Sequence, residues 1–163
     1  PQRGSRVALI DLKLVDEAGF FRRTLECAVV KLVCEKAAGK ELSDDFVLAL
    51  KANLNLQDFY LENPVPDKLM ELDNEFHHLL FSCVDKERCY RMCCDMGIHF
   101  DRIRHLALHT VKELKIVGDH HDILSAICAC DADRAYALMA AHLTRFEIDE
   151  KLIKNEYPEY FVN

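Results

Sequence analysis

Three histidines and one aspartate carry the strongest chemical signal in the sequence. Asp73 and His77 are four residues apart, so on a helix they share one face. His120 and His142 each have apolar residues three or four positions away, which places both on apolar helix faces. Imidazole nitrogens and carboxylate oxygens are ligands for zinc, nickel, iron or manganese, and the facing helices of a bundle can present them to one ion. The four residues together therefore predict a buried metal site.

A structural role is the alternative for each histidine taken alone. Histidine is often half-buried in proteins without binding a ligand, so any one of the three fits that description. The combination of three histidines with Asp73 favours the metal. His78 and His121 adjoin two of the predicted ligands but point about 100° away around the helix, and we expect them at the surface or behind the ligands.

Two arginines beside apolar helix stripes are candidates for binding an anion. Arg22 lies near Leu25, and Arg102 lies near Leu106. Such side chains usually extend to solvent. A guanidinium that reaches the metal site instead would bind a carboxylate, because its two donors match the two oxygens. We predict this ligand-binding role for Arg22 and Arg102.

The elements that must position these residues are predicted to be helices throughout. Gly and Pro number only five and four, and they lie at the ends of long periodic stretches. The pattern predicts an all-α antiparallel bundle of six amphipathic helices. The first helix is expected over about 16–38, the second from its N-cap Ser43 to before Asn63, and the third from Pro66 onwards. The fourth is expected from its N-cap Asp85 through Leu106, the fifth over roughly 111–129, and the sixth from its N-cap Asp131 towards Pro158.

Composition excludes several classes of protein. The chain has 163 residues, half of them apolar, which suits one domain with a sizeable core. Its formal charge of −7 argues against these residues binding nucleic acid, because phosphate binding needs a basic face. No apolar run approaches the ~18 residues of a membrane span, and no signal peptide opens the chain. We therefore expect a cytoplasmic protein without a membrane partner.

The eight cysteines are expected to be reduced thiols. They occur in a chain with ample apolar residues and no secretion signal, which argues against a disulfide framework. The C-x3-C-C pattern over 89–94 and the C-x-C pattern over 128–130 both lack the C-x2-C spacing of structural zinc sites. Most of these cysteines should pack as small apolar residues, although a redox role stays open.

Four motifs, in order along the chain, resemble those of a known family. Residues 22–26 are similar to its R-x-x-L-E, residues 73–77 to its D-x-x-F-H, residues 119–127 to its E-H-x-x-I-L-x-A-I, and residues 131–143 to its D-x-x-x-A followed by M-x-x-H-L. The chain thus resembles the FCD domain, the ligand-sensing domain of GntR-family transcription regulators of the FadR type. The resemblance covers about residues 12–150 and departs from the pattern at Asp119, where Glu is usual.

The resemblance implies a site and a function. Asp73, His77, His120 and His142 would bind a divalent metal ion, with zinc as first choice and nickel or manganese as alternatives. The fold implied is a bundle of six or seven helices around a central cavity, where a small carboxylate metabolite completes the coordination of the ion. The ion would anchor the ligand and not catalyse a reaction, so the chain is expected not to be an enzyme. Regulators of this kind read paired half-sites of DNA, which predicts a homodimer.

The head of the chain resembles another part of such regulators. Residues 1–7, Pro-Gln-Arg-Gly-Ser-Arg-Val, are similar to the end of the wing in their winged-helix DNA-binding domain. We therefore expect residues 1–11 to be a remnant of the wing and linker, and residues 12–163 to be the effector-binding domain. Operator DNA would be contacted only through an N-terminal domain absent from this sequence. The alternative is the N-terminal arm of a stand-alone protein.

Two other functions stay open at the level of the sequence. An HD-type metal-dependent phosphohydrolase is also helical and rich in histidine, and His121-Asp122 supplies an H-D pair. The remaining spacing of that family's pattern is missing, and His121 does not share the face of His120. A structural dimerisation module would bind neither metal nor metabolite. Lactate, sugar acids and di- or tricarboxylates all fit a metal ion plus one guanidinium.

Overall fold

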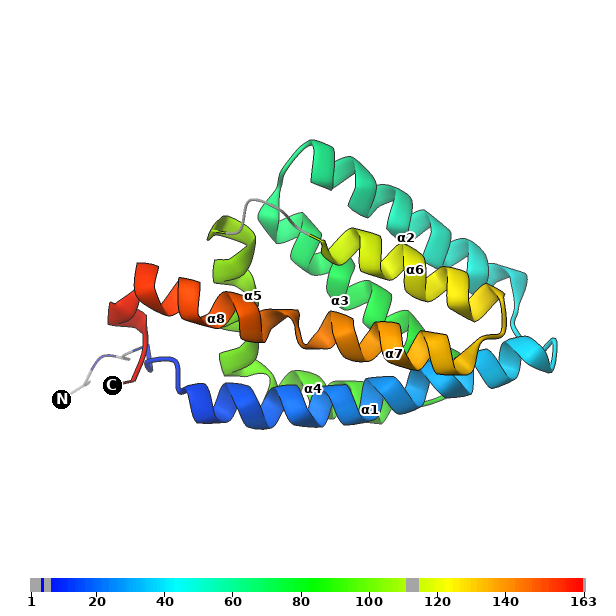
Figure 1. Cartoon of the computed structure of the whole chain (residues 1–163), viewed down its shortest axis with the longest axis horizontal. Helices are drawn as coiled ribbons and strands as arrows, with labels where there is room; N and C mark the ends of the chain where they lie inside the picture. Colours follow the sequence, from blue (N-terminus) through cyan, green and yellow to red (C-terminus); the bar gives the residue numbers. More distant parts are fainter. Residues whose placement is uncertain (1–3, 5–6, 111–114, 163) are drawn as a thin grey trace.

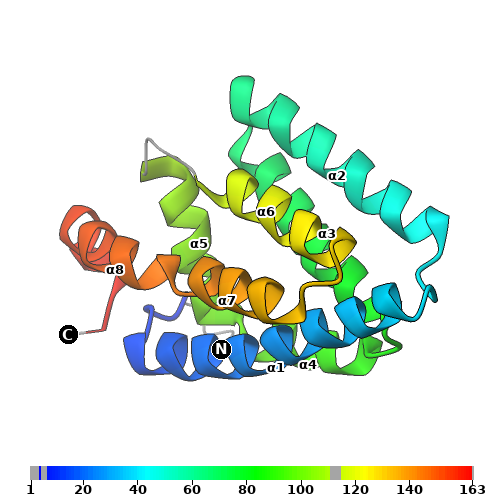
Figure 2. The same ribbon diagram turned by 45° about the vertical axis from the view of Figure 1, so that its right-hand side comes forward.

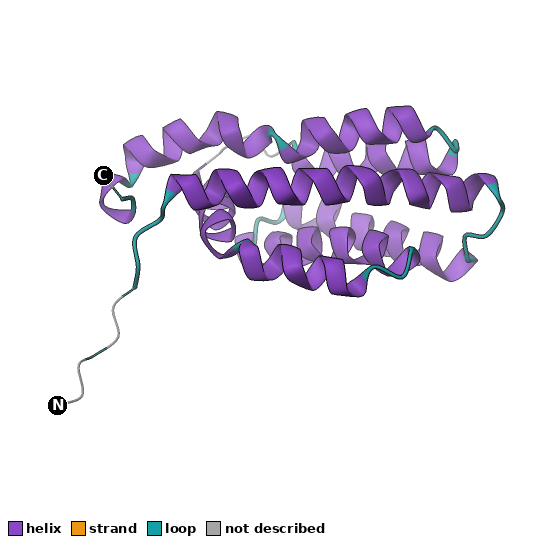
Figure 3. Cartoon of the chain, turned by 90° about the horizontal axis from the view of Figure 1, so that it is seen from below, coloured by secondary structure: helices purple, strands orange, loops and turns teal. Residues whose placement is uncertain are grey.

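The described chain is built from helices. The computed structural model describes residue 4, residues 7–110 and residues 115–162, with the side chains of 109, 110 and 146–151 excepted. Within these ranges no β-strand occurs beyond an isolated bridge between Ile10 and Phe161 (Figure 3). The elements are α1 (Leu12–Ala38), α2 (Asp44–Glu62), α3 (Pro66–Cys83), α4 (Glu87–Met96), α5 (Ile98–Thr110), α6 (Ile116–Cys128), α7 (Ala132–Leu143), α8 (Arg145–Glu156) and the 3-10 helix η1 (Pro158–Tyr160). The all-α prediction is confirmed.

Capping residues set most helix ends where the sequence predicts them. The side chain of Ser43 accepts from the amide of Phe46 at 3.1 Å, and that of Asp131 accepts from the amide of Arg134 at 3.0 Å. The predicted cap Asp85 is wrong, because Asp85 adopts a left-handed backbone with a φ of 57° and α4 begins two residues later. The first helix also begins earlier than predicted, because Asp11 caps it.

Two of the six predicted helices are each divided in the structure. The predicted helix from Asp85 through Leu106 breaks at Gly97, where a Cβ would lie 3.0 Å from the carbonyl oxygen of Cys93. The last predicted helix breaks at Thr144, whose hydroxyl donates to carbonyls of the preceding turn at 2.9 and 3.2 Å. The start of the predicted helix over 111–129 lies partly outside the described residues, and α6 begins at Ile116.

The helices form a bundle with its main core between α1, α2, α3, α6 and α7. In Figure 1, α7 runs along α1, and α6 lies between α7 and α2, while α3 lies behind them. Figure 2, turned by 45°, shows the same order of helices. Fully buried residues of this core include Val30, Leu50, Phe76, Ile127 and Met139.

A second, smaller apolar cluster lies at the other end of the molecule. Figure 1 shows α5 rising steeply from the end of α4, with α8 beside it and the two chain ends nearby. The cluster joins the N-terminal segment, α1, α5, α8 and the C-terminal segment, through Ile10, Val15, Ala18, Phe100, Ile103, Ile153 and Phe161. Because the chain turns at Gly97, α5 packs in this second cluster through Phe100 and Ile103.

Two sequence expectations concern the membrane and the cysteines. Among the helices described, none is both long enough and apolar enough to cross a membrane. All eight cysteines are free thiols, and Cys27, Cys34 and Cys93 are buried, whereas Cys94, Cys128 and Cys130 are exposed. Burial raises the pKa of the Cys93 thiol to about 12, which keeps it protonated.

Candidate metal centre

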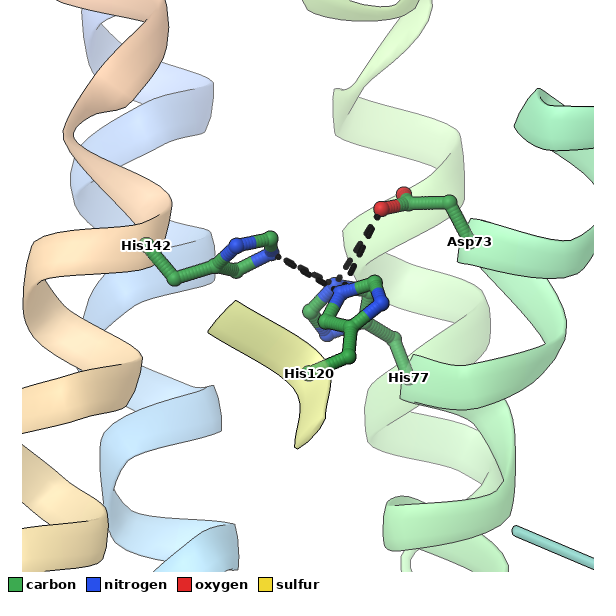
Figure 4. A group of neighbouring side chains, drawn as sticks. All are labelled: Asp73, His77, His120 and His142. Carbon is green, nitrogen blue, oxygen red and sulfur yellow. Dashed lines mark hydrogen bonds and ion pairs between the residues drawn. The ribbon is translucent and has the colours of Figure 1, made fainter. Parts of the chain in front are cut away.

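Three helices of the main core bring four potential metal ligands together. Asp73 and His77 come from α3, His120 from α6 and His142 from α7, and all four are buried. One ligand atom from each lies within 4.8 Å of the others. The Nε2 atom of His142 is 3.2 Å from the Nε2 of His77 and 3.2 Å from that of His120, while Asp73 Oδ1 is 3.5 Å from His120 Nε2. Figure 4 shows these side chains pointing toward one another.

The second nitrogen of each imidazole contacts an oxygen acceptor. His77 Nδ1 lies against the carboxylate of Glu26, on α1. His120 Nδ1 is 2.8 Å from Gln57 Oε1, on α2, and His142 Nδ1 is 3.3 Å from Asp119 Oδ2, on α6. An acceptor at Nδ1 holds the proton there and turns the lone pair of Nε2 toward the cluster, which is the arrangement of metal-binding histidines.

A chain of amides fixes the orientation of Gln57. Asn53 Nδ2 donates to the carbonyl of Leu72 at 3.1 Å and to Glu75 at 3.0 Å, so its Oδ1 faces Gln57. Gln57 Nε2 donates to that oxygen at 2.6 Å. Gln57 must therefore present its Oε1 to His120, which places the proton of His120 on Nδ1.

The charge states of the cluster suit a cation. Burial, followed by the charge of His142, lowers the pKa of His120 well below its ordinary value, and burial lowers that of His77. Burial would raise the pKa of Asp73, but Arg104, His77 and His120 outweigh it and lower this pKa. His77 and His120 are thus neutral imidazoles beside the ionised carboxylate of Asp73, and a divalent cation between their lone pairs would stabilise this arrangement.

Two further carboxylates behind the histidines are also kept ionised. Burial would raise the pKa of Glu26, but its contacts with Arg22 and His77 lower it to about 2. Burial likewise opposes the effect of His142 and Arg145 on Asp119, whose pKa is lowered to about 2. Both acids can therefore accept from an imidazole N–H at neutral pH.

The structure places the two predicted ligand-binding arginines differently. Arg22 is near the cluster, where its guanidinium, on a side chain that is 12% exposed, pairs with Glu26 and lies 5.6 Å from the ring centre of Phe100. Arg102 does not reach the cluster, because its guanidinium donates to the carbonyl of Ala8 at 2.7 Å. Arg104, two positions along α5, pairs with Asp73 instead. Arg104 therefore occupies the place beside the cluster that was expected for Arg102, since two residues turn the side chain by about 200° around a helix.

A cavity of about 40 Å³ lies beside these arginines, and it is connected to the cluster through Glu26, which contacts His77, and through Arg104, which pairs with Asp73. Arg22, Glu26 and Arg104 line it, together with Asn74, Tyr90 and Phe100. One water molecule needs at least about 10–15 Å³ of such a cavity, so this cavity has room for a few atoms. Its two guanidiniums give it the chemistry to bind a carboxylate.

The acceptors behind the histidines should control metal affinity. Asp119→Asn removes the charge that accepts from His142 Nδ1 and pairs with Arg145, so zinc affinity should fall about 10- to 100-fold. Competition with a chromophoric chelator measures this affinity. Asp122→Asn is the matched control, because Asp122 is exposed on the same helix and should leave the affinity unchanged. Equal affinities for the two variants would contradict the role of Asp119.

Sequence reasoning assigned no role to Glu26, Gln57 or Arg104, and it noted Asp119 only as a departure from the family motif. A signal existed for Gln57, which occupies the next position of the stripe formed by Leu50 and Leu54 and is only 1% exposed. Glu26 stands four residues after Arg22 on α1, the spacing of a helical ion pair. No comparable signal separates Arg104 from Arg102, because only the packing of α5 distinguishes them.

The H-D pair of the phosphohydrolase alternative lies outside this cluster. His121 is half exposed and pairs with Asp58 at 3.0 Å, and Asp122 is exposed. His78 is likewise outside the cluster and pairs with Glu87 at 2.7 Å. Neither residue of the pair therefore belongs to the group of candidate ligands found among the described residues.

Comparisons with known proteins agree with the resemblance. The model of the FCD domain family matches residues 17–145. An HTH-type transcriptional repressor, RspR of Escherichia coli K12, is 28% identical over 162 residues, which are 99% of this chain and 69% of the relative. The uncharacterised HTH-type transcriptional regulator YdfH of Shigella flexneri matches with the same identity and coverage. The chain therefore belongs to the FCD domain family, and the relatives it resembles along almost its whole length are named as transcription regulators.

Proposed function

We propose that this chain is the effector-sensing domain of a GntR-family transcription regulator, in which a bound divalent metal ion anchors a small organic acid. Asp73, His77, His120 and His142 hold the ion. The observation that carries the proposal is the convergence of three imidazole Nε2 atoms and Asp73 Oδ1, with each Nδ1 facing an oxygen acceptor. Three nitrogens and one oxygen suit zinc first, and nickel or manganese next.

The acid binds in the cavity beside the ion. Its carboxylate contacts Arg22 and Arg104, whose charges are now balanced by Glu26 and Asp73. The small volume of the cavity favours an acid with few atoms, such as lactate, over citrate, unless side chains move. The ion contributes an electropositive binding position, while the residues of this chain orient the acid and exclude water.

The remaining parts of the proposal concern the whole regulator. Residues 1–11 are the end of a wing and linker, although residues 1–3 and 5–6 of that stretch lie outside the described part of the chain. The regulator binds operator DNA through an upstream helix-turn-helix domain, as the names of the relatives suggest, and it does so as a homodimer in the cytoplasm.

Metal analysis combined with an acid screen tests this function. The purified chain should contain about one metal ion, and with zinc present one acid among lactate, gluconate, malate and citrate should raise the melting temperature. At 100 times its Kd, the acid should add about 2.7 kcal/mol, which is roughly 5–10 °C for a domain of this size. Arg104→Ala should lose most of this shift, whereas the exposed Arg134→Ala on α7 should keep it. A chain that binds no divalent metal would refute the proposal.

A further inference from the structure

Helix α5 contacts both the candidate effector cavity and the segment that leads into the domain. This linker segment comprises residues 7–11, directly before α1. Around a helix each residue advances by about 100°, so residues 100, 101 and 104 share one side, and residues 99 and 102 lie on nearly the opposite side. The contacts of α5 divide in the same way.

The cavity side of α5 is tied to a candidate metal ligand. Phe100, Asp101 and Arg104 line the cavity. Arg104 pairs with Asp73 through Oδ2, the carboxylate oxygen that does not face the histidines, and with Asp101 at 2.7 Å. The position of Asp73 therefore determines where Arg104, and with it this face of α5, is held.

The other side of α5 holds the backbone of the linker segment. Arg102 Nη1 donates to the carbonyl of Ala8 at 2.7 Å, and His99 Nδ1 accepts from the amide of Asp11 at 3.1 Å. Both contacts are made to backbone atoms, so they fix the path of the chain and not the side chains it carries.

Packing connects the two sides of α5. Ile10 is only 1% exposed and belongs to the same apolar cluster as Phe100 and Ile103. The C-terminal segment completes the enclosure of Ile10. The amide of Ile10 donates to the carbonyl of Tyr160 at 2.7 Å, and the carbonyl of Ile10 accepts from the amide of Val162 at 2.9 Å. Phe100 thus lines the cavity and contributes to the apolar cluster that encloses the linker segment.

We propose that α5 transmits the state of the metal and effector site to the linker segment, with Arg104 as its contact to the site and Arg102 and His99 as its contacts to the linker. The inference rests on the proposed function and adds the helix through which binding at the site affects the linker segment. A cation on Asp73 Oδ1 fixes this carboxylate and so holds Arg104 and α5. An acid that draws Arg104 away from Asp73 loosens the hold on residues 8–11. Ligands shift such an equilibrium by their differential affinity for the two arrangements.

Amide hydrogen exchange of Ile10 and Asp11, followed by NMR, tests the inference with zinc alone as the probe. In the wild-type chain, zinc should slow exchange at both amides by about threefold or more. Arg102→Ala should bind zinc with unchanged stoichiometry, exchange faster at Ile10 and Asp11, and lose the response to zinc. The control Arg134→Ala should behave as wild type. Amides in the middle of α2, such as that of Leu54, should not change in any of these proteins.

A second variant tests the inference without metal. In the zinc-free protein, Arg104→Ala should speed exchange at Ile10 and Asp11 while α2 keeps its protection. Stoichiometric zinc binding without any change at these two amides would overturn the inference and leave the proposed function intact. An Arg104→Ala chain that exchanges like wild type would also overturn it. Absence of zinc binding would refute both proposals together.

Discussion

Zinc affinity is expected to fall by at least about a hundredfold when His120 is replaced by alanine. Loss of an acceptor behind a ligand costs 10- to 100-fold, and loss of the ligand itself should cost no less. His120 supplies one of the converging nitrogens and is fully buried, 3.2 Å from the ligand nitrogen of His142. Chelator competition at neutral pH measures the affinity, and metal analysis after gel filtration measures the stoichiometry.

The adjacent histidine provides the control. His121→Ala removes an imidazole from the next position of α6, where it pairs with Asp58 at the surface, and zinc affinity should stay within about twofold of wild type. Since His120 stacks on Phe76 at 4.0 Å, its removal also affects packing, and circular dichroism of the zinc-free variants verifies folding. His142→Ala, at a less enclosed position, should lose zinc as well. A folded His120→Ala chain with wild-type affinity would exclude His120 as a ligand.

Removal of Glu26 should cost the zinc-free protein about 3 kcal/mol in free energy of unfolding. This carboxylate is 2% exposed and contacts both the guanidinium of Arg22 and His77 Nδ1. Glu26→Ala leaves the charge of Arg22, whose side chain is only 12% exposed, without its partner, and a largely desolvated charge without compensation is among the largest single causes of destabilisation. Urea denaturation in the presence of a chelator measures the loss apart from any effect of metal.

A second ion pair on the same helix gives the comparison. Lys13 and Glu17 are also four residues apart on α1, but their atoms are 3.9 Å apart and both side chains are exposed. Glu17→Ala should change stability by no more than about 0.5 kcal/mol. Glu26→Gln keeps the volume and an acceptor oxygen, so its loss in free energy of unfolding should lie between those of Glu26→Ala and Glu17→Ala. If Glu26→Ala lowered the free energy of unfolding as little as Glu17→Ala, the prediction would be contradicted, and Arg22 would be compensated by another partner or by solvent.

The two proposals assign different roles to neighbouring polar and charged side chains. Glu26, Gln57 and Asp119 orient the histidines, so their effects should appear in metal affinity. Arg22 and Arg104 line the cavity, so their effects should appear in the response to an acid. Arg102 holds the backbone of the linker segment, and its effect should appear at the amides of residues 10 and 11. The three kinds of measurement therefore separate binding of the ion, binding of the acid and readout.

The sequence by itself determined the helical class and the four residues of the cluster. Apolar residues recur with the helical period, so a polar residue within such a stripe is recognisable wherever the helix packs. That rule applies to Asp73, His77, His120 and His142, which the structure brings within 4.8 Å of one another. Caps such as Ser43 are equally local, because the side chain and the amide it accepts from are three residues apart.

Only the tertiary structure decided which charged residues stand behind and beside the cluster. The break at Gly97 turns α5 away from the direction of α4, and this turn places Arg104 on Asp73 and Arg102 on the backbone of Ala8. Glu26 and Gln57 reach the histidines from α1 and α2, across distances of about 50 and 60 residues along the chain. Periodicity assigns a residue to a helix face, but it carries no information about which face of another helix lies opposite, and that pairing depends on how the whole core packs.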